Sequence, residues 1–355
     1  MKRLFPILIG SVLLICTSAT CEYLATGPGG SGGGGQGSGG GGGNASTEGY
    51  IGANFPDQRF QEFAQKEGIR VERHDYAPDE QNSKGDPCRR FADIYYPKGT
   101  PKGIFLLFHG GGFDVGYADH KNMAIKAKGL TERGYIAASV EYRRGWTNAQ
   151  FSGSDRDVFN SSPAEYARLE TAARMAIDDA RLAVEYIRDE VGKTLPVYAE
   201  GTSAGGSLVL YLALIDKQWR EANNISGGIC GYGGISIDEA PSIVAPDFPL
   251  LMAGGIHDTR VPFYQGWYFE ANNKSEQGIG MGEIYNRLAP LDAPVCLIAT
   301  CNAGHVYGAL NDDEIFDLFF DLLDDFEKGK DDLPQRTNYI MSHQGGADQV
   351  VSNCE

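Results

Sequence analysis

The chain has 355 residues, of which 42% are apolar, so it can bury a large core and is not wholly disordered. That length suits one large domain with tails. Asp and Glu outnumber Lys and Arg by 47 to 31, and the resulting formal charge of -16 argues against a nucleic-acid partner.

The first segment, residues 1–20, has the pattern of a signal peptide. Two basic residues precede an apolar run at positions 4–15, which is too short to span a bilayer. Small residues then lead to Cys21, as in a bacterial lipoprotein cleavage site, although Ser18 stands where such sites usually carry Leu. We therefore expect export, either with a lipid anchor at Cys21 or as a secreted or periplasmic protein cut near Ala19.

A glycine-rich linker is expected at residues 21–49, because positions 27–43 contain 13 glycines in 17 residues and offer little to pack. The catalytic domain should follow at residues 50–328, and residues 329–355 read as a loose polar tail. Five cysteines follow the linker, so at least one of them has no partner among the other four. Their spacing matches no zinc site, and we expect neither a metal nor another cofactor.

The body alternates strand and helix patterns, which predicts a mostly parallel sheet with helices on both faces, an α/β fold. Continuous apolar runs, typical of buried parallel strands, occupy residues 103–108, 135–140, 195–199, 248–253 and 294–300. Helical spacing of apolar residues occupies residues 123–133, 165–189, 207–215 and 312–327.

A sharp turn carrying a serine is predicted at Gly201-Thr-Ser-Ala-Gly-Gly206, between a strand and a helix. This G-x-S-x-G context holds the serine in a strained turn and exposes its hydroxyl. Ser203 is the candidate nucleophile, and the N–H of Ala204 a candidate oxyanion donor. Glu200 is unexpected on a buried strand and should either border the pocket or pair with an arginine.

A glycine loop, His109-Gly-Gly-Gly-Phe113, follows the strand at 103–108. Glycines let backbone N–H groups approach a substrate, so Gly111 and Gly112 are candidate oxyanion donors beside Ala204. His109 is expected to brace this loop and not to transfer protons.

The base and its orienting acid should follow later strands, at the sheet edge where such sites form. His305 comes just after the strand at 294–300 and is the candidate base, with His257 as its rival. Asp258 follows the strand at 248–253, whereas the alternative acid, Asp292, precedes its strand. The chain order Ser, Asp, His is that of the α/β-hydrolases.

These motifs resemble an α/β-hydrolase of the bacterial esterase and lipase group related to hormone-sensitive lipase. The resemblance covers about residues 85–328 and includes Tyr142-Arg143 and the Asp178-Asp179-Ala180 segment. Thr202 departs from it, since many relatives carry Asp or Glu there. The resemblance implies acyl transfer through Ser203, His305 and Asp258, and by analogy with exported esterases it suggests acetyl or feruloyl esters of plant polysaccharides as substrates.

Residues 143–169 are expected to form an insertion, either a cap whose Trp146, Phe151, Phe159 and Tyr166 contact substrate or a loop that those aromatics anchor. The leading functional prediction is an exported serine carboxylic ester hydrolase. A serine peptidase or amidase with the same triad, and a silent binding protein on a hydrolase fold, are the alternatives. The sequence leaves the oligomeric state open.

Overall fold

A nine-stranded sheet forms the centre of the computed structural model, with the strand order β1-β2-β4-β3-β5-β6-β8-β11-β12. The structure describes residues 66–147, 162–269, 276–301, 303–307, 310–329 and 339–342. Strand β2 (Pro87–Tyr96) runs antiparallel to both of its neighbours, β1 (Arg70–Gln81) and β4 (Ile136–Val140). From β4 onward every pairing in this sheet is parallel.

The parallel part of the sheet contains the five strands that the apolar runs predict. They are β3 (Ile104–Phe108), β4, β5 (Val197–Thr202), β8 (Leu250–Gly255) and β11 (Val295–Cys301). Two further members are β6 (Ile225–Gly231) and the short β12 (Tyr339–Ser342), which pairs with β11. A loose tail was expected where β12 lies, and this expectation was wrong for those residues because their backbone joins the sheet.

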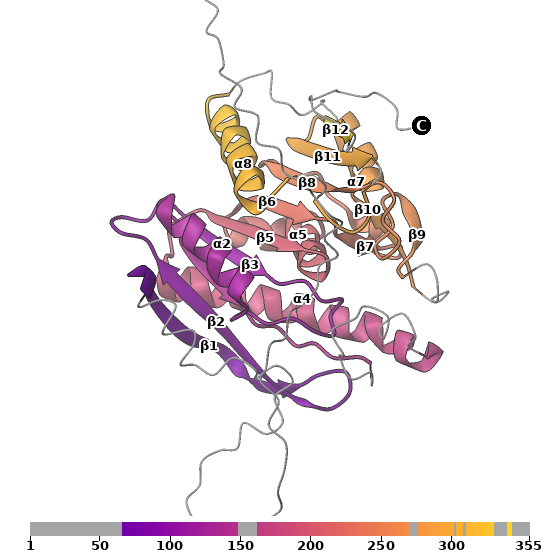
Figure 1. Cartoon of the computed structure of the whole chain (residues 1–355), viewed down its shortest axis with the longest axis horizontal. Helices are drawn as coiled ribbons and strands as arrows, with labels where there is room; N and C mark the ends of the chain where they lie inside the picture. The colour runs from indigo at the N-terminus through magenta and orange to yellow at the C-terminus, as the bar shows by residue number, and fades with distance from the viewer. Residues whose placement is uncertain are drawn as a thin grey trace, which may run out of the picture.

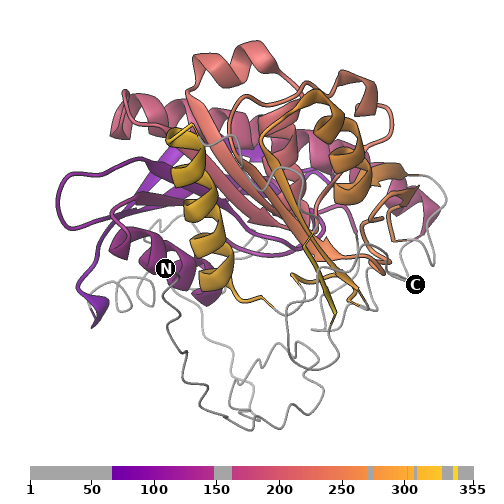
Figure 2. The same cartoon turned by 90° about the horizontal axis from the view of Figure 1, so that it is seen from above.

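Helices cover both faces of the sheet (Figures 1 and 2). On one face, α2 (Lys121–Glu132) and α8 (Asp312–Glu327) pack through apolar side chains, and the acids of α8 remain on its outer side. On the other face lie α4 (Pro163–Val191), α5 (Ala204–Leu214) and α7 (Met281–Leu288). A mostly parallel sheet in which only β2 runs in the opposite direction, with helices on both faces, is the α/β-hydrolase fold that the sequence predicts.

Smaller elements complete the fold around the central sheet. Helix α6 (Lys217–Ala222) precedes β6, and a three-stranded sheet combines β7 (Gly234–Ser236), β9 (Gln265–Trp267) and β10 (Gln277–Gly280). Two short 3-10 helices, η1 (Ala240–Ser242) and η2 (Ala289–Leu291), close turns. Among the described helices none is long and apolar enough to cross a membrane.

The strand β6 is not predicted from the sequence, because its glycines interrupt the continuous apolar run by which the other parallel strands are recognised. A Cβ added at Gly227 would lie 2.8 Å from Phe319 Cζ, and one at Gly228 would lie 3.0 Å from Val209 Cγ1. Both faces of this strand are therefore filled by neighbouring side chains that require glycine. Its central position places Gly231, the last residue of β6, beside the serine turn.

Candidate active site

The serine turn joins β5 directly to α5 and holds Ser203 at φ 56° and ψ -120°, in the left-handed half of backbone space. Glycine is needed at positions 201 and 205, because at each of them another stretch of backbone passes too close to leave room for a Cβ atom. A Cβ at Gly205 would lie 2.0 Å from the carbonyl oxygen of Phe108, and one at Gly201 would lie 2.4 Å from the carbonyl carbon of Gly205. The Ser203 N–H donates to the Gly231 carbonyl at 2.8 Å, which fixes the turn against β6.

Three side chains that the sequence singled out form one hydrogen-bonded chain. His305 Nε2 lies 2.7 Å from Ser203 Oγ, and His305 Nδ1 lies 2.6 Å from Asp258 Oδ2. The other Asp258 oxygen accepts the backbone N–H groups of Arg260 at 2.8 Å and Val261 at 3.0 Å. With the carboxylate fixed in this way, the consistent tautomer carries its proton on Nδ1 and leaves Nε2 free to accept one.

The glycine loop runs directly beside this chain. A Cβ added at Gly110 would lie 3.4 Å from Ser203 Cβ, and Gly111 and Gly112 follow with φ values of 118° and 60°. Ala204 is the first residue of α5, so its N–H has no acceptor within the helix. The loop and the helix start thus bring backbone donors to the surroundings of the serine hydroxyl.

His109 is buried and braces the glycine loop. Its Nδ1 lies 2.7 Å from the Gly110 carbonyl oxygen, and its ring stacks on Tyr142 at a centroid distance of 4.2 Å. Burial, with the positive charge of Arg144, lowers the pKa of His109 to about 3. A ring that stays neutral and hydrogen-bonded to its own loop is suited to support and not to proton transfer.

The hydrogen-bonded chain includes neither the side chain of any other described histidine nor the alternative acid. His257 is exposed, and His74 sits on β1 against Tyr186. His120 caps the start of α2, and His343 lies outside the described residues. Asp292 precedes β11 and therefore lies at the opposite sheet edge from His305, as expected.

Glu200 neither borders the pocket nor pairs with an arginine, so both expectations for it were wrong. Its side chain is buried and accepts a hydrogen bond from Lys126 Nζ at 2.7 Å. The hydroxyl of Tyr307 donates to the same oxygen at 3.1 Å. Sequence reasoning overlooked both partners, because α2 and the segment after β11 meet β5 only through the folded sheet.

Tyr232 is a second neighbour of the site that the sequence did not reveal. Its ring meets the His305 ring edge-on, with centroids 4.6 Å apart and planes at 68°. It follows β6, the strand that the apolar-run criterion missed, and it has a positive φ of 37°. Non-glycine residues in this conformation are uncommon and often border functional sites.

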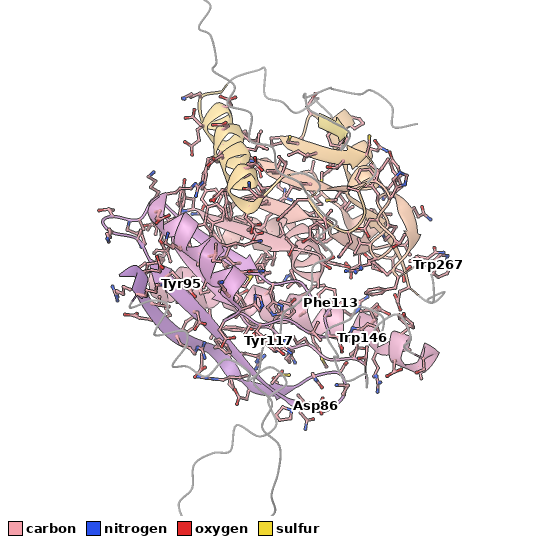
Figure 3. All side chains as sticks on the ribbon, in the orientation of Figure 1. Asp86, Tyr95, Phe113, Tyr117, Trp146 and Trp267 are labelled. Atoms are coloured by element: carbon pink, nitrogen blue, oxygen red, sulfur yellow. The ribbon has the colours of Figure 1, made fainter. Side chains whose placement is uncertain are left out.

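Two of the aromatics predicted in the insertion, Trp146 and Tyr166, serve as anchors. Trp146 is 0% exposed and Tyr166 1% exposed, and their ring centroids lie 5.3 Å apart. Phe113 packs against the same cluster, and Figure 3 labels Phe113 and Trp146. Trp146 Nε1 donates to the Gly112 carbonyl at 2.7 Å, so the cluster also supports the glycine loop. The insertion is shorter than the predicted 143–169, because α4 already begins at Pro163; Phe151 and Phe159 lie outside the described residues.

A small pocket of about 190 Å³ lies against Asp258 and is lined mainly by the following loop, including Tyr264 and Trp267. Ser203 and His305 are not among its lining residues. Within the described part of the chain, no group of three or more His, Cys, Asp or Glu side chains is arranged to hold a metal ion.

Comparison with known proteins gives structural similarity at low sequence identity. No family model and no curated protein sequence matches the chain. Esterase 2 of Thermogutta terrifontis, phosphorylated by paraoxon, is 17% identical with a TM-score of 0.47, covering 75% of this chain and 95% of that one. The propionate-bound form of the same esterase is 17% identical with a TM-score of 0.46, covering 74% of this chain and 95% of that one. TT1662 from Thermus thermophilus is 18% identical with a TM-score of 0.46, covering 73% of this chain and 98% of that one. At this identity, function has to be argued from the site itself.

Proposed function

We propose that the protein is a serine carboxylic ester hydrolase that works through an acyl-enzyme. The observation that carries this proposal is the continuous chain from Ser203 Oγ through the His305 imidazole to Asp258, with heavy-atom distances of 2.7 and 2.6 Å. A base within hydrogen-bond reach of a hydroxyl, itself oriented by a carboxylate, is the arrangement that nucleophilic acyl transfer requires.

In the proposed first step, His305 Nε2 accepts the proton of Ser203 as the serine oxygen attacks the ester carbonyl carbon. The N–H groups of Gly111, Gly112 and Ala204 donate to the oxyanion that develops. Asp258 holds the imidazole in position and stabilises its protonated form. His305 then gives the proton to the leaving alcohol, and a water molecule repeats the attack to release the acid and restore Ser203.

The proposed substrates are short-chain or aromatic esters, with acetyl and feruloyl groups on plant polysaccharides as the leading class. This finer assignment rests on the resemblance of the glycine loop, the serine turn and the Gly304-His305 segment to exported bacterial esterases. It implies no cofactor, since each step uses only side chains, backbone N–H groups and water.

The test compares the parent protein with Ser203→Ala on p-nitrophenyl acetate, butyrate and octanoate, methyl ferulate, acetylated xylan and an aminoacyl anilide. We expect ester turnover in the parent and a fall in kcat of about 10⁴-fold or more in the variant, because the nucleophile is lost. Faster hydrolysis of the anilide than of the esters would instead identify a peptidase or amidase. Absence of all turnover and of labelling by a fluorophosphonate would identify a silent binding protein.

We also propose that the protein is exported. Cys301 is disulfide-bonded, and such bonds persist mainly in oxidising compartments. The signal segment, the linker and Cys21 lie outside the described residues, so lipid attachment is tested on cells. Labelling with a clickable fatty acid should mark the parent and not Cys21→Ala; an unlabelled parent in the envelope or medium would mean plain secretion.

A further inference from the structure

A buried carboxylate lies three residues before Ser203 and joins three separate elements. Glu200 on β5 is 1% exposed, and its Oε1 accepts from Lys126 Nζ of α2 and from the Tyr307 hydroxyl. Lys126 Nζ also lies 3.3 Å from Asp312 Oδ1, at the first residue of α8. Lys126, Glu200 and Tyr307 are called the buried triplet below.

The buried triplet reaches His305 by two routes. Along the chain, Tyr307 is only two residues beyond His305, on the same short segment. Through space, the Tyr307 ring meets Tyr232 edge-on at 5.3 Å, and Tyr232 in turn meets the His305 ring at 4.6 Å. Glycine makes this packing possible, because a Cβ at Gly231 would lie 2.4 Å from the Tyr307 ring.

Gly231 also links this packing to the nucleophile, since its carbonyl accepts the Ser203 N–H at 2.8 Å. The strand with the serine turn, the end of β6 and the histidine segment therefore meet around one tyrosine ring. A small displacement of that ring would move His305 relative to Ser203.

The charges of the buried triplet are costly to the fold. Burial raises the pKa of Glu200, and the positive charge of Lys126 opposes that rise. Replacing a buried ion pair by apolar residues of similar size is often neutral or stabilising, so stability alone explains such a pair poorly. The pair does fix the position of an acceptor, because Lys126 holds the Glu200 carboxylate in place and the Tyr307 hydroxyl donates to that carboxylate.

From this geometry we propose that the buried triplet positions His305, by tying the segment from Ala303 to Tyr307 to the strand that carries Ser203. Glu200 and Tyr307 are positioning residues in this proposal, because neither contacts the serine hydroxyl. The expected effect on kcat rests on the proposed function. The expected effect on the position of His305 does not, and it can be measured without substrate.

The test uses Tyr307→Phe, which removes a single hydroxyl, with Glu200→Gln as a second variant. Tyr198→Phe is the matched control: Tyr198 is buried in the same core cluster, two residues before Glu200 on β5, and its hydroxyl makes no hydrogen bond to the described residues. With active sites counted by fluorophosphonate titration, Tyr307→Phe and Glu200→Gln should each lower kcat about tenfold and leave KM unchanged. Tyr198→Phe should match the parent.

A substrate-free readout separates this proposal from the proposed function. The proton on His305 Nδ1, bonded to Asp258, should give a downfield proton NMR resonance that His305→Ala removes. We expect Tyr307→Phe to shift or broaden it and Tyr198→Phe to leave it unchanged. If the parent hydrolyses esters, an unchanged kcat in folded Tyr307→Phe overturns the proposal. If the parent is inactive, the proposed function fails by itself, and an unchanged resonance in Tyr307→Phe overturns the positioning role.

Discussion

At the scale of single residues, the choice between two aspartates depends on which end of a strand each one occupies. Asp258 follows β8 and meets His305, whereas Asp292 precedes β11 at the other edge of the sheet. The sequence predicts this distinction because parallel strands align their carboxyl ends. The partners of Glu200 could not be predicted in the same way, since no local pattern relates Lys126 or Tyr307 to it.

The two aspartates provide a matched pair of substitutions. Asp258→Asn should keep the shape of the site but lower kcat about 10⁴-fold, because an amide no longer stabilises the tautomer and the charged form of His305. Asp292→Asn should retain the activity of the parent, and Asn tolerates the left-handed backbone (φ 54°) at this position. Steady-state kinetics on p-nitrophenyl acetate measures both, and equal losses in the two variants would contradict the assignment.

His109 should make the stability of the protein depend on pH. Its pKa falls from the ordinary 6.5 to about 3 in the folded state because of burial and the nearby Arg144. The folded state thus favours the neutral ring, and this contribution is complete above pH 6.5 and is lost progressively as the pH falls toward 3. The loss is about 1.4 kcal/mol for each pH unit within that window.

Urea unfolding at pH 7.5 and pH 5 measures this effect. Between these two pH values, the parent should lose more free energy of unfolding than His109→Gln, whose amide does not titrate. Equal losses in the two proteins would show that His109 is not the group responsible.

At the scale of elements, the helix α4 is fastened to the sheet by one buried acid. Asp179 is 0% exposed and accepts the Arg143 backbone N–H at 2.8 Å, together with the Arg143 guanidinium and Arg90 of β2. The segment held in this way leads to Trp146 and so to the glycine loop. The helix pattern predicts α4 closely, but β1 and β2 are not predicted, because their polar residues do not form an apolar run.

Adjacent acids on α4 allow this fastening to be tested. Among the described residues, Asp179→Asn leaves Arg90 and Arg143 with only the exposed Glu80 as a carboxylate partner, and the loss of the buried one should lower the free energy of unfolding by about 3–5 kcal/mol. Asp178 is exposed, and Asp178→Asn should change the free energy of unfolding by less than about 0.5 kcal/mol. Chemical denaturation of both variants provides the comparison, and a similar small effect in both would refute the role given to Asp179.

At the scale of the whole molecule, the parallel half of the fold is predictable because its strands are buried on both faces and therefore apolar throughout. The serine turn, the glycine loop and the two later loops follow from those strands, since each motif comes directly after one. Strand β6 and the short β12 lack that signal, and β6 ends at Gly231 and is followed directly by Tyr232. The unpredicted parts of the site are thus those that depend on contacts between distant segments.

The hydrogen bond between Ser203 and His305 joins residues 102 positions apart in the chain. At a synthesis rate of about 5–20 residues per second, His305 is added roughly 5–20 s after Ser203. A nascent or truncated chain that ends before β11 contains Ser203, the proposed nucleophile, without His305, its proposed base. Under the proposed function, hydrolytic competence is therefore acquired only after β11 and the segment with His305 have been synthesised, and activity reports that this late part of the sheet has joined the earlier strands.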